Sequence, residues 1–214
     1  EAKRNGGSVR ARLDLDNVWS QAHGVAAEAF RALCVSVTLA PGAPGRGRVV
    51  QITSGQPGEG KSTVIANLAV ALRKSGARVL VVDLDLRKPV QHRQWKQLRA
   101  PGYSDLVAAA GGDDAGRKLV HTTTPWEVDV LCAGSKLPDT LSSLMTPLLD
   151  GLLAQWAAQY DYVLLDSPPA FVPDTTVVAK HVDLLLMVVR PGVVERASLR
   201  QAVAALERVQ VNRG

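Results

Sequence analysis

Short apolar runs alternate along this chain with longer segments in which apolar residues recur every three or four positions. The short runs are rich in β-branched residues, which is typical of strands buried on both faces. They predict strands at residues 48–54, 79–82, 128–132, 162–165 and 183–190. The periodic segments predict helices at residues 24–39, 62–74, 104–110, 148–159 and 195–209. This alternation indicates a parallel sheet with helices on its faces.

The same pattern suggests how the chain is divided. Residues 1–21 are polar and irregular, and we interpret them as a tail or linker, whereas residues 22–214 form one α/β domain. The longest apolar runs, such as residues 184–189, are far too short to cross a bilayer. The last predicted helix has one apolar face that we expect to cover the sheet, made of Leu199, Val203, Leu206 and Val209.

Composition and charge limit the classes of protein and partner that this sequence suits. An apolar fraction of 46% is that of an ordinary soluble globular protein. The formal net charge of +5 permits an acidic partner or an acidic membrane surface but does not establish one. Cys34 and Cys132 have no metal-ligand spacing and suit a reduced, cytosolic protein. The four tryptophans are not interleaved with a basic stripe, so we expect no nucleic-acid partner.

One stretch predicts a phosphate site. Residues 55–62 match the phosphate-loop (Walker A) pattern G-x-x-x-x-G-K-[ST], between a predicted strand and a predicted helix. Glycines let the backbone approach a phosphate, and the N–H groups at the start of the helix favour an anion. Lys61 can reach the outer phosphates, and the Ser62 hydroxyl can bind Mg²⁺. The predicted nucleotide-binding residues are Gly55, Gln56, Pro57, Gly58, Glu59, Gly60, Lys61, Ser62 and Thr63.

Three aspartates follow two other predicted strands. Asp83 and Asp85 come after residues 79–82, and Asp166 comes after residues 162–165. In an open α/β sheet, ligands bind at the carboxyl ends of the strands, so these carboxylates can meet a magnesium–phosphate complex together. Alone, each could be a solvated loop residue, and the phosphate loop favours the functional interpretation. The fold therefore is expected to be of the P-loop NTPase type, a three-layer sandwich with a mainly parallel central sheet flanked by helices.

These motifs resemble the cytoplasmic kinase domain of the bacterial tyrosine kinases that accompany capsular and exopolysaccharide export. The segment P-G-E-G-K-S at residues 57–62 resembles that family's phosphate loop. VVDLDLRKP resembles its second motif and places Asp83, Asp85 and Arg87, whereas LLDSPP resembles its third and places Asp166. Weaker similarities are Glu28 and Arg31, His92, and residues 102–107.

The resemblance implies an ATP-dependent protein-tyrosine kinase that transfers the γ-phosphoryl group of ATP to tyrosines on a neighbouring copy of the same protein. It implies ATP and Mg²⁺ as cofactors. Lys61, Asp83 and Asp85 would be the catalytic residues, with Asp85 orienting or deprotonating the tyrosine, and Ser62, Asp83 and Asp166 would hold Mg²⁺ and its waters. The implied partners are a homo-oligomer, a tyrosine-bearing substrate and a transmembrane chain-length-determinant or activator segment, fused or separate. That segment would hold the domain at the cytoplasmic face of the bacterial inner membrane, where it would regulate polysaccharide synthesis or export.

The sequence also departs from the family pattern. Tyr103, Tyr160 and Tyr162 all lie in the body of the domain rather than in a tyrosine-rich tail, and Tyr162 is expected in the core. The family's E-x-x-R-x-x-R helix ends here in Cys34, which puts assembly through that helix in doubt.

Two alternative functions stay open. One is an ATP-binding scaffold of the export machinery that transfers nothing. The other is a partitioning or cell-division positioning ATPase, which would carry an extra lysine at the position that Gln56 occupies.

Overall fold

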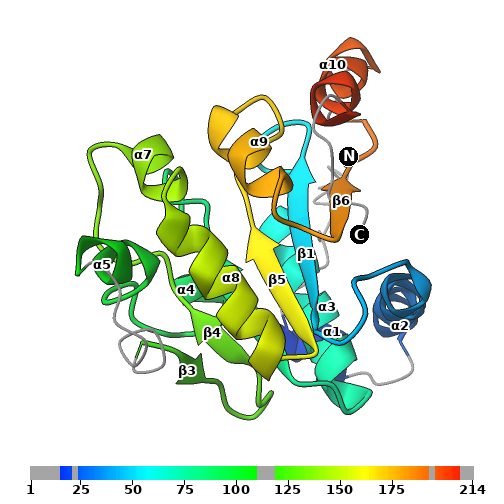
Figure 1. The fold of residues 1–214 in the computed structure, drawn as a ribbon. Coiled ribbons are helices and arrows are strands. Elements are labelled where there is room, and N and C mark those ends of the chain that lie inside the picture. The colour runs from blue at the N-terminus through cyan, green and yellow to red at the C-terminus, as the bar shows by residue number, and fades with distance from the viewer. Residues whose placement is uncertain (1–14, 21–23, 110–118, 193–195, 208–214) are drawn as a thin grey trace, which may run out of the picture.

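The computed structural model describes residues 15–20, 24–109, 119–192 and 196–207. Within them lies a six-stranded sheet in the order β3-β4-β2-β5-β1-β6 (Figure 1). The strands are β1 (Arg48–Ser54), β2 (Val79–Asp83), β3 (His121–Thr122), β4 (Asp129–Leu131), β5 (Tyr162–Asp166) and β6 (Leu184–Val188). All neighbouring strands pair in parallel except β3, which is antiparallel to β4. The mainly parallel sheet expected from the sequence is thus confirmed.

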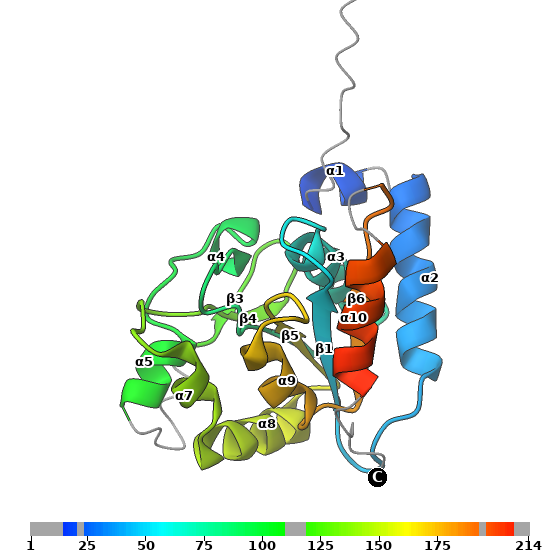
Figure 2. The same cartoon turned by 90° about the horizontal axis from the view of Figure 1, so that it is seen from above.

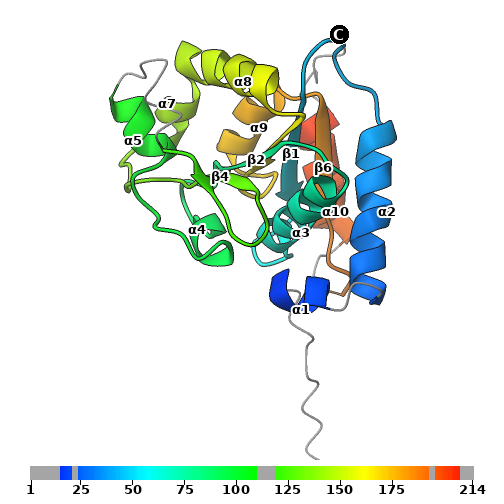
Figure 3. The same ribbon diagram turned by 90° about the horizontal axis from the view of Figure 1, so that it is seen from below.

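Helices cover both faces of this sheet, and α3 and α8 lie on opposite sides of the strands (Figures 2 and 3). The described helices are α1 (Leu15–Ser20), α2 (Val25–Leu39), α3 (Lys61–Lys74), α4 (Gln91–Gln94), α5 (Tyr103–Ala108), α7 (Thr140–Leu144), α8 (Pro147–Gln159), α9 (Pro173–Ala179) and α10 (Arg196–Glu207). One core cluster joins α1, α2 and α3 to the sheet, and a second joins α5, α7, α8 and α9 to its other face. The three-layer sandwich is therefore confirmed.

The first described helix corrects the expectation of an irregular tail up to residue 21. Leu15, Val18 and Trp19 recur at helical spacing, and all three are buried in the same core cluster as α2 and α3. Lys74 and Arg31 also lie over the Trp19 ring. Because the apolar face has only three residues among polar neighbours, the periodicity was too short to be recognised in the sequence. Residues 1–14 and 21–23 lie outside the described residues.

The last described helix covers the sheet as expected, and its covering face includes Leu206 but not Val203. Ala202 and Leu206 are buried against Leu185 and Met187 of β6. Val203, expected on the covering face, is 39% exposed, because α10 is turned so that the alanine rather than the valine meets the strand. Val209 lies outside the described residues. β3, α7 and α9 were not expected, because they are short and lack a clear period.

Candidate functional site

The phosphate loop leaves the carboxyl end of β1 and turns directly into α3. Gly58 and Gly60 have φ of +82° and +99°, a left-handed conformation that side-chain-bearing residues rarely adopt. With no Cβ at these points, the loop curls around the open N-terminal turn of α3, whose first residue is Lys61. The loop forms the floor of a cavity of about 710 Å³ that is lined there by Pro57, Gly58, Gly60, Lys61, Ser62 and Thr63.

Glu59 braces the loop from inside. Its carboxylate accepts hydrogen bonds from the backbone N–H groups of Gln56, at 2.6 Å, and of Arg190, at 3.0 Å. Ser54 adds a third contact, since its hydroxyl donates to the carbonyl of Gln56 at 2.7 Å. Glu59 is only 5% exposed and does not line the cavity. Gly55, Gln56 and Glu59 therefore shape the loop, whereas the other predicted nucleotide-binding residues face the cavity.

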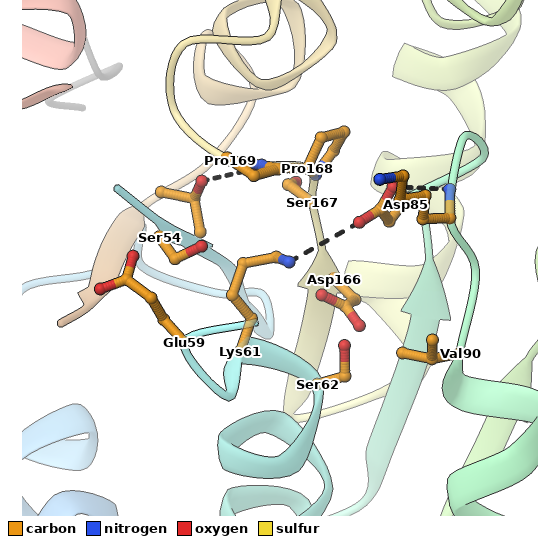
Figure 4. Close-up of polar contacts among 12 residues, drawn as sticks. Ser54, Glu59, Lys61, Ser62, Asp85, Val90, Asp166, Ser167, Pro168 and Pro169 are labelled. Atoms are coloured by element: carbon orange, nitrogen blue, oxygen red, sulfur yellow. Dashed lines mark hydrogen bonds and ion pairs between the residues drawn. The ribbon is translucent and has the colours of Figure 1, made fainter. Parts of the chain in front are cut away.

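Parallel pairing brings the aspartates together. In the register of β2 and β5, Asp83 lies opposite Asp166, and Asp85 follows two positions later. The Asp85 carboxylate lies 3.6 Å from the ammonium of Lys61, and both side chains are buried to the same extent (Figure 4). The sequence-predicted convergence of Lys61, Ser62, Asp83, Asp85 and Asp166 on one end of the sheet is thus observed. Of the three aspartates, Asp85 alone lines the cavity.

Asp83 holds the segment that follows β2. One of its oxygens accepts from the N–H of Asp85 at 3.2 Å, and the other accepts from the N–H groups of Val90, at 3.1 Å, and Gln91, at 2.9 Å. The side chain is fully buried. Burial and the neighbouring Asp166 raise the pKa of Asp83 well above its ordinary value, because a second charge in this dry site is costly. In this arrangement Asp83 positions Asp85 at the cavity.

Gln91 is a site residue that the sequence did not reveal. Its side-chain amide donates to Asp166 at 2.8 Å and to the backbone carbonyl of Ser62 at 3.3 Å, while its carbonyl oxygen accepts from the Trp95 indole at 2.9 Å. Gln91 is fully buried and links Asp83, Asp166 and the start of α3. The sequence feature that could have identified Gln91 is its position at the start of a short helix, close behind the D-x-D-x-R motif.

The Asp166 carboxylate has one oxygen that is available to a cation. Burial raises its pKa to about 6, although Lys61, Ser62 and Gln91 each lower it. Within the described part of the chain, its Oδ1 atom is buried and has no hydrogen-bond partner. Figure 4 shows the hydroxyl of Ser62 beside this carboxylate. A bare carboxylate oxygen next to a hydroxyl at a phosphate loop fits a hard cation such as Mg²⁺ or a water that the cation holds.

No group of three or more His, Cys, Asp or Glu side chains is arranged as a metal site among the described residues. Magnesium in nucleotide sites takes one or two protein oxygens and completes its shell with phosphates and waters.

A family model described as an AAA domain matches residues 47–213, which is most of the chain. The chain belongs to the AAA domain family. Within the domain, the match begins just before β1 and so includes the phosphate loop and all three aspartates.

Individual relatives of this AAA domain are named as tyrosine kinases. It is 32% identical to the tyrosine-protein kinase YwqD of Bacillus subtilis, over 73% of this chain and 65% of the relative. It is 31% identical to the tyrosine-protein kinase wzc of Salmonella typhimurium, over 88% of this chain and 25% of the relative. The chain thus spans about a quarter of the longer relatives that it matches.

A solved structure supports the same relationship. The kinase domain of the Escherichia coli tyrosine kinase ETK superposes with a TM-score of 0.79 at 29% identity, and the match covers 86% of this chain and 71% of that domain. Together with the strand order observed here, this confirms a P-loop NTPase-type fold and a relationship to bacterial tyrosine kinase domains.

The tyrosines of this AAA domain form hydrogen bonds within the fold. Tyr103 is fully buried, its hydroxyl donates to the Ser143 carbonyl at 3.1 Å, and burial raises its pKa. Tyr160 donates to Asp129 at 2.8 Å. Tyr162, expected in the core, is half-buried and packs against it, with its hydroxyl 3.2 Å from that of Thr38.

Helix α2 carries the altered form of the E-x-x-R-x-x-R motif. On α2, Arg31 pairs with Glu28 at the surface, whereas Cys34 points into the core and is buried beside Phe30 and Val37. Cys34 and Cys132 are both buried, free thiols. None of the described helices combines the length and the apolar character that a bilayer-spanning segment needs.

Proposed function

We propose that this domain is an ATP-dependent protein-tyrosine kinase that uses Mg²⁺. The observation that carries the proposal is the contact between Lys61 and Asp85 at the mouth of the phosphate loop. The Lys61 ammonium, which can bind the outer phosphates, lies 3.6 Å from the Asp85 carboxylate, which can accept the proton of an incoming hydroxyl. A reacting group placed beside them can therefore contact both side chains. The names of the relatives support this reaction class.

Different residues of the chain have different roles in the proposed reaction. The backbone N–H groups of the phosphate loop bind the phosphates, and Lys61 neutralises the charge on the group in transfer. Ser62 and Asp166 would hold Mg²⁺ directly or through water, with Asp83 next to Asp166 in the neighbouring strand, and the metal would supply further neutralisation of the phosphate charge. Asp85 orients the tyrosine hydroxyl and takes its proton as the phenolic oxygen bonds to the γ-phosphorus. The bond from that phosphorus to the β–γ bridging oxygen breaks, and ADP leaves. Positioning and charge neutralisation supply most of the catalysis.

The wider setting follows from the resemblance of the motifs to the kinases of capsule and exopolysaccharide export. We propose that the acceptor tyrosines belong to another copy of the protein or to a separate substrate. We further propose that a transmembrane activator segment, fused or separate, keeps the domain at the inner face of the plasma membrane, where it regulates polysaccharide synthesis or export.

One incubation tests the reaction class. The purified domain is mixed with γ-labelled ATP, Mg²⁺ and a tyrosine-containing polypeptide, and the label is traced. Label on phosphotyrosine supports the kinase. Release of free phosphate without phosphotyrosine identifies a positioning-type ATPase, and the absence of both products identifies a nucleotide-binding scaffold.

A further inference from the structure

The cavity above the phosphate loop has two unlike walls. One follows β5 and is made of Pro168, Pro169, Phe171 and Val172; the other follows β2 and is made of Asp85, Arg87, Lys88, Val90, Arg93 and Gln94. Figure 4 shows Pro168, Pro169 and Asp85 gathered around the end of the Lys61 side chain. The phosphate loop accounts for the floor of this cavity, whereas the proposed reaction gives a role to Asp85 alone among the wall residues.

The first wall is apolar and ends in an exposed aromatic ring. Phe171 is 64% exposed although it lies at the rim of a cavity and next to two prolines. The prolines are buried and fix the course of this segment. The carbonyl of Pro168 also accepts hydrogen bonds from the hydroxyls of Thr53 and Thr175, which anchors the segment to β1 and α9. An exposed ring next to such an anchored segment offers a partner for another aromatic ring.

The opposite wall is basic. Lys88 and Arg93 are exposed, and within the described residues no carboxylate pairs with either of them. Arg87 lines the same wall, but its guanidinium is already bound to Asp174. Two cations at a cavity mouth, without carboxylate partners, attract a negatively charged ligand group.

We propose that these walls bind the acceptor polypeptide, and that the acceptor is a tyrosine in an acidic segment. The tyrosine ring packs against Phe171, Pro168 and Pro169, and its hydroxyl reaches Asp85. Carboxylates beside that tyrosine bind Lys88 and Arg93. The inference rests on the proposed kinase function and adds the chemical class of its protein substrate.

Two peptides of equal length test the inference, each with a single tyrosine, one flanked by glutamates and one by lysines. Their binding to the domain is measured by fluorescence anisotropy with Mg²⁺ and a non-hydrolysable ATP analogue, and their phosphorylation with ATP. We expect the glutamate peptide to bind roughly tenfold or more tightly than the lysine peptide. The double substitution Lys88→Glu/Arg93→Glu should reverse that preference when both proteins are saturated with the nucleotide analogue.

A matched control makes the same change in net charge elsewhere. Arg196→Glu/Arg200→Glu alters two exposed residues of α10, neither of which lines the cavity. It should keep the wild-type preference for the glutamate peptide. Phe171→Ala should raise the KM for the peptide and leave the affinity for nucleotide unchanged.

Three results would overturn the inference: equal affinity of the wild-type domain for both peptides, an unchanged preference in the Lys88→Glu/Arg93→Glu variant, or a loss of nucleotide affinity in Phe171→Ala with peptide binding intact. The last would show that the ring serves the nucleotide. If the wild-type domain binds the glutamate peptide selectively but forms no phosphotyrosine, the proposed function fails and the binding surface stands. The two failures are therefore distinguishable.

Discussion

Arg87 and Asp174 join the segment after β2 to the first turn of α9. The Nε and Nη2 atoms of Arg87 donate to the two oxygens of Asp174 at 3.1 and 2.9 Å. Asp174 is fully buried and also accepts from the Thr140 hydroxyl at 2.8 Å, whereas the Arg87 side chain is about half exposed. The pair fixes the distance between the two walls of the cavity, because each residue belongs to a different wall-forming segment.

Removal of Arg87 should therefore destabilise the domain. Arg87→Ala leaves the buried Asp174 carboxylate with the Thr140 hydroxyl as its remaining side-chain donor, and we expect a loss of roughly 2 kcal/mol in the free energy of unfolding, measured in urea. Arg78→Ala is the matched control. Arg78 makes a similar two-pronged contact with Asp161, but at the exposed surface, so its loss should cost under about 1 kcal/mol. Equal costs at the two positions would refute the structural role given to the buried pair.

Gln91 should support magnesium binding without touching the nucleotide. Gln91→Leu removes the amide that holds Asp166 and the carbonyl of Ser62, so the two residues that we propose as metal ligands lose their fixed orientation. We expect the affinity for Mg²⁺ in the presence of a fluorescent ATP analogue to fall about 10-fold. Gln97→Leu, a short distance along the chain and away from the cavity lining, is the control and should bind Mg²⁺ as the wild type does. Unchanged affinity in Gln91→Leu would show that Asp166 needs no such support.

The buried Asp166 carboxyl should give the domain an unusual dependence of stability on pH in the absence of metal. Burial raises its pKa from 3.8 to about 6, so between these values the folded state holds the proton more tightly than the unfolded chain does. The stability that the protonated carboxyl contributes is complete below pH 3.8 and is lost as the pH rises through 6. Asp166→Asn, which is never charged, should thus be more stable than the wild type at pH 7.5 in EDTA, and the difference should shrink toward pH 5.

Asp161→Asn provides a control of opposite sign. The hydrogen bond from Arg78 lowers the pKa of Asp161, so its contribution to stability is present at neutral pH and lost in acid. This variant should be slightly less stable than the wild type at pH 7.5, with a difference that also shrinks as the pH falls. Urea unfolding of both variants at several pH values would decide, and destabilisation by Asp166→Asn at pH 7.5 would contradict the burial argument.

The sequence predicted the sheet and the floor of the site because both depend on local patterns. Buried parallel strands are continuous apolar runs, and the phosphate loop needs glycine where φ is positive, as at Gly58 and Gly60. The convergence of Asp83 and Asp166 followed from the rule that parallel strands end at one edge of the sheet.

Other parts of the site depend on tertiary contacts and were not predictable. Gln91 acts through partners from β2, β5 and α3, and no spacing in the chain encodes that combination. The inward turn of Glu59 likewise depends on Arg190, which is 131 positions away. The helix at Leu15–Ser20 was missed because three apolar residues are too few to define a period.

The central claim is that Lys61 and Asp85 form a site for phosphoryl transfer to tyrosine. The most direct test compares the wild-type domain with Lys61→Met for phosphotyrosine formed from γ-labelled ATP, with circular dichroism as the check on folding. The account predicts labelled phosphotyrosine from the wild type and a loss of at least about 100-fold in Lys61→Met, which stays folded. Phosphotyrosine formed at the wild-type rate by folded Lys61→Met would contradict it.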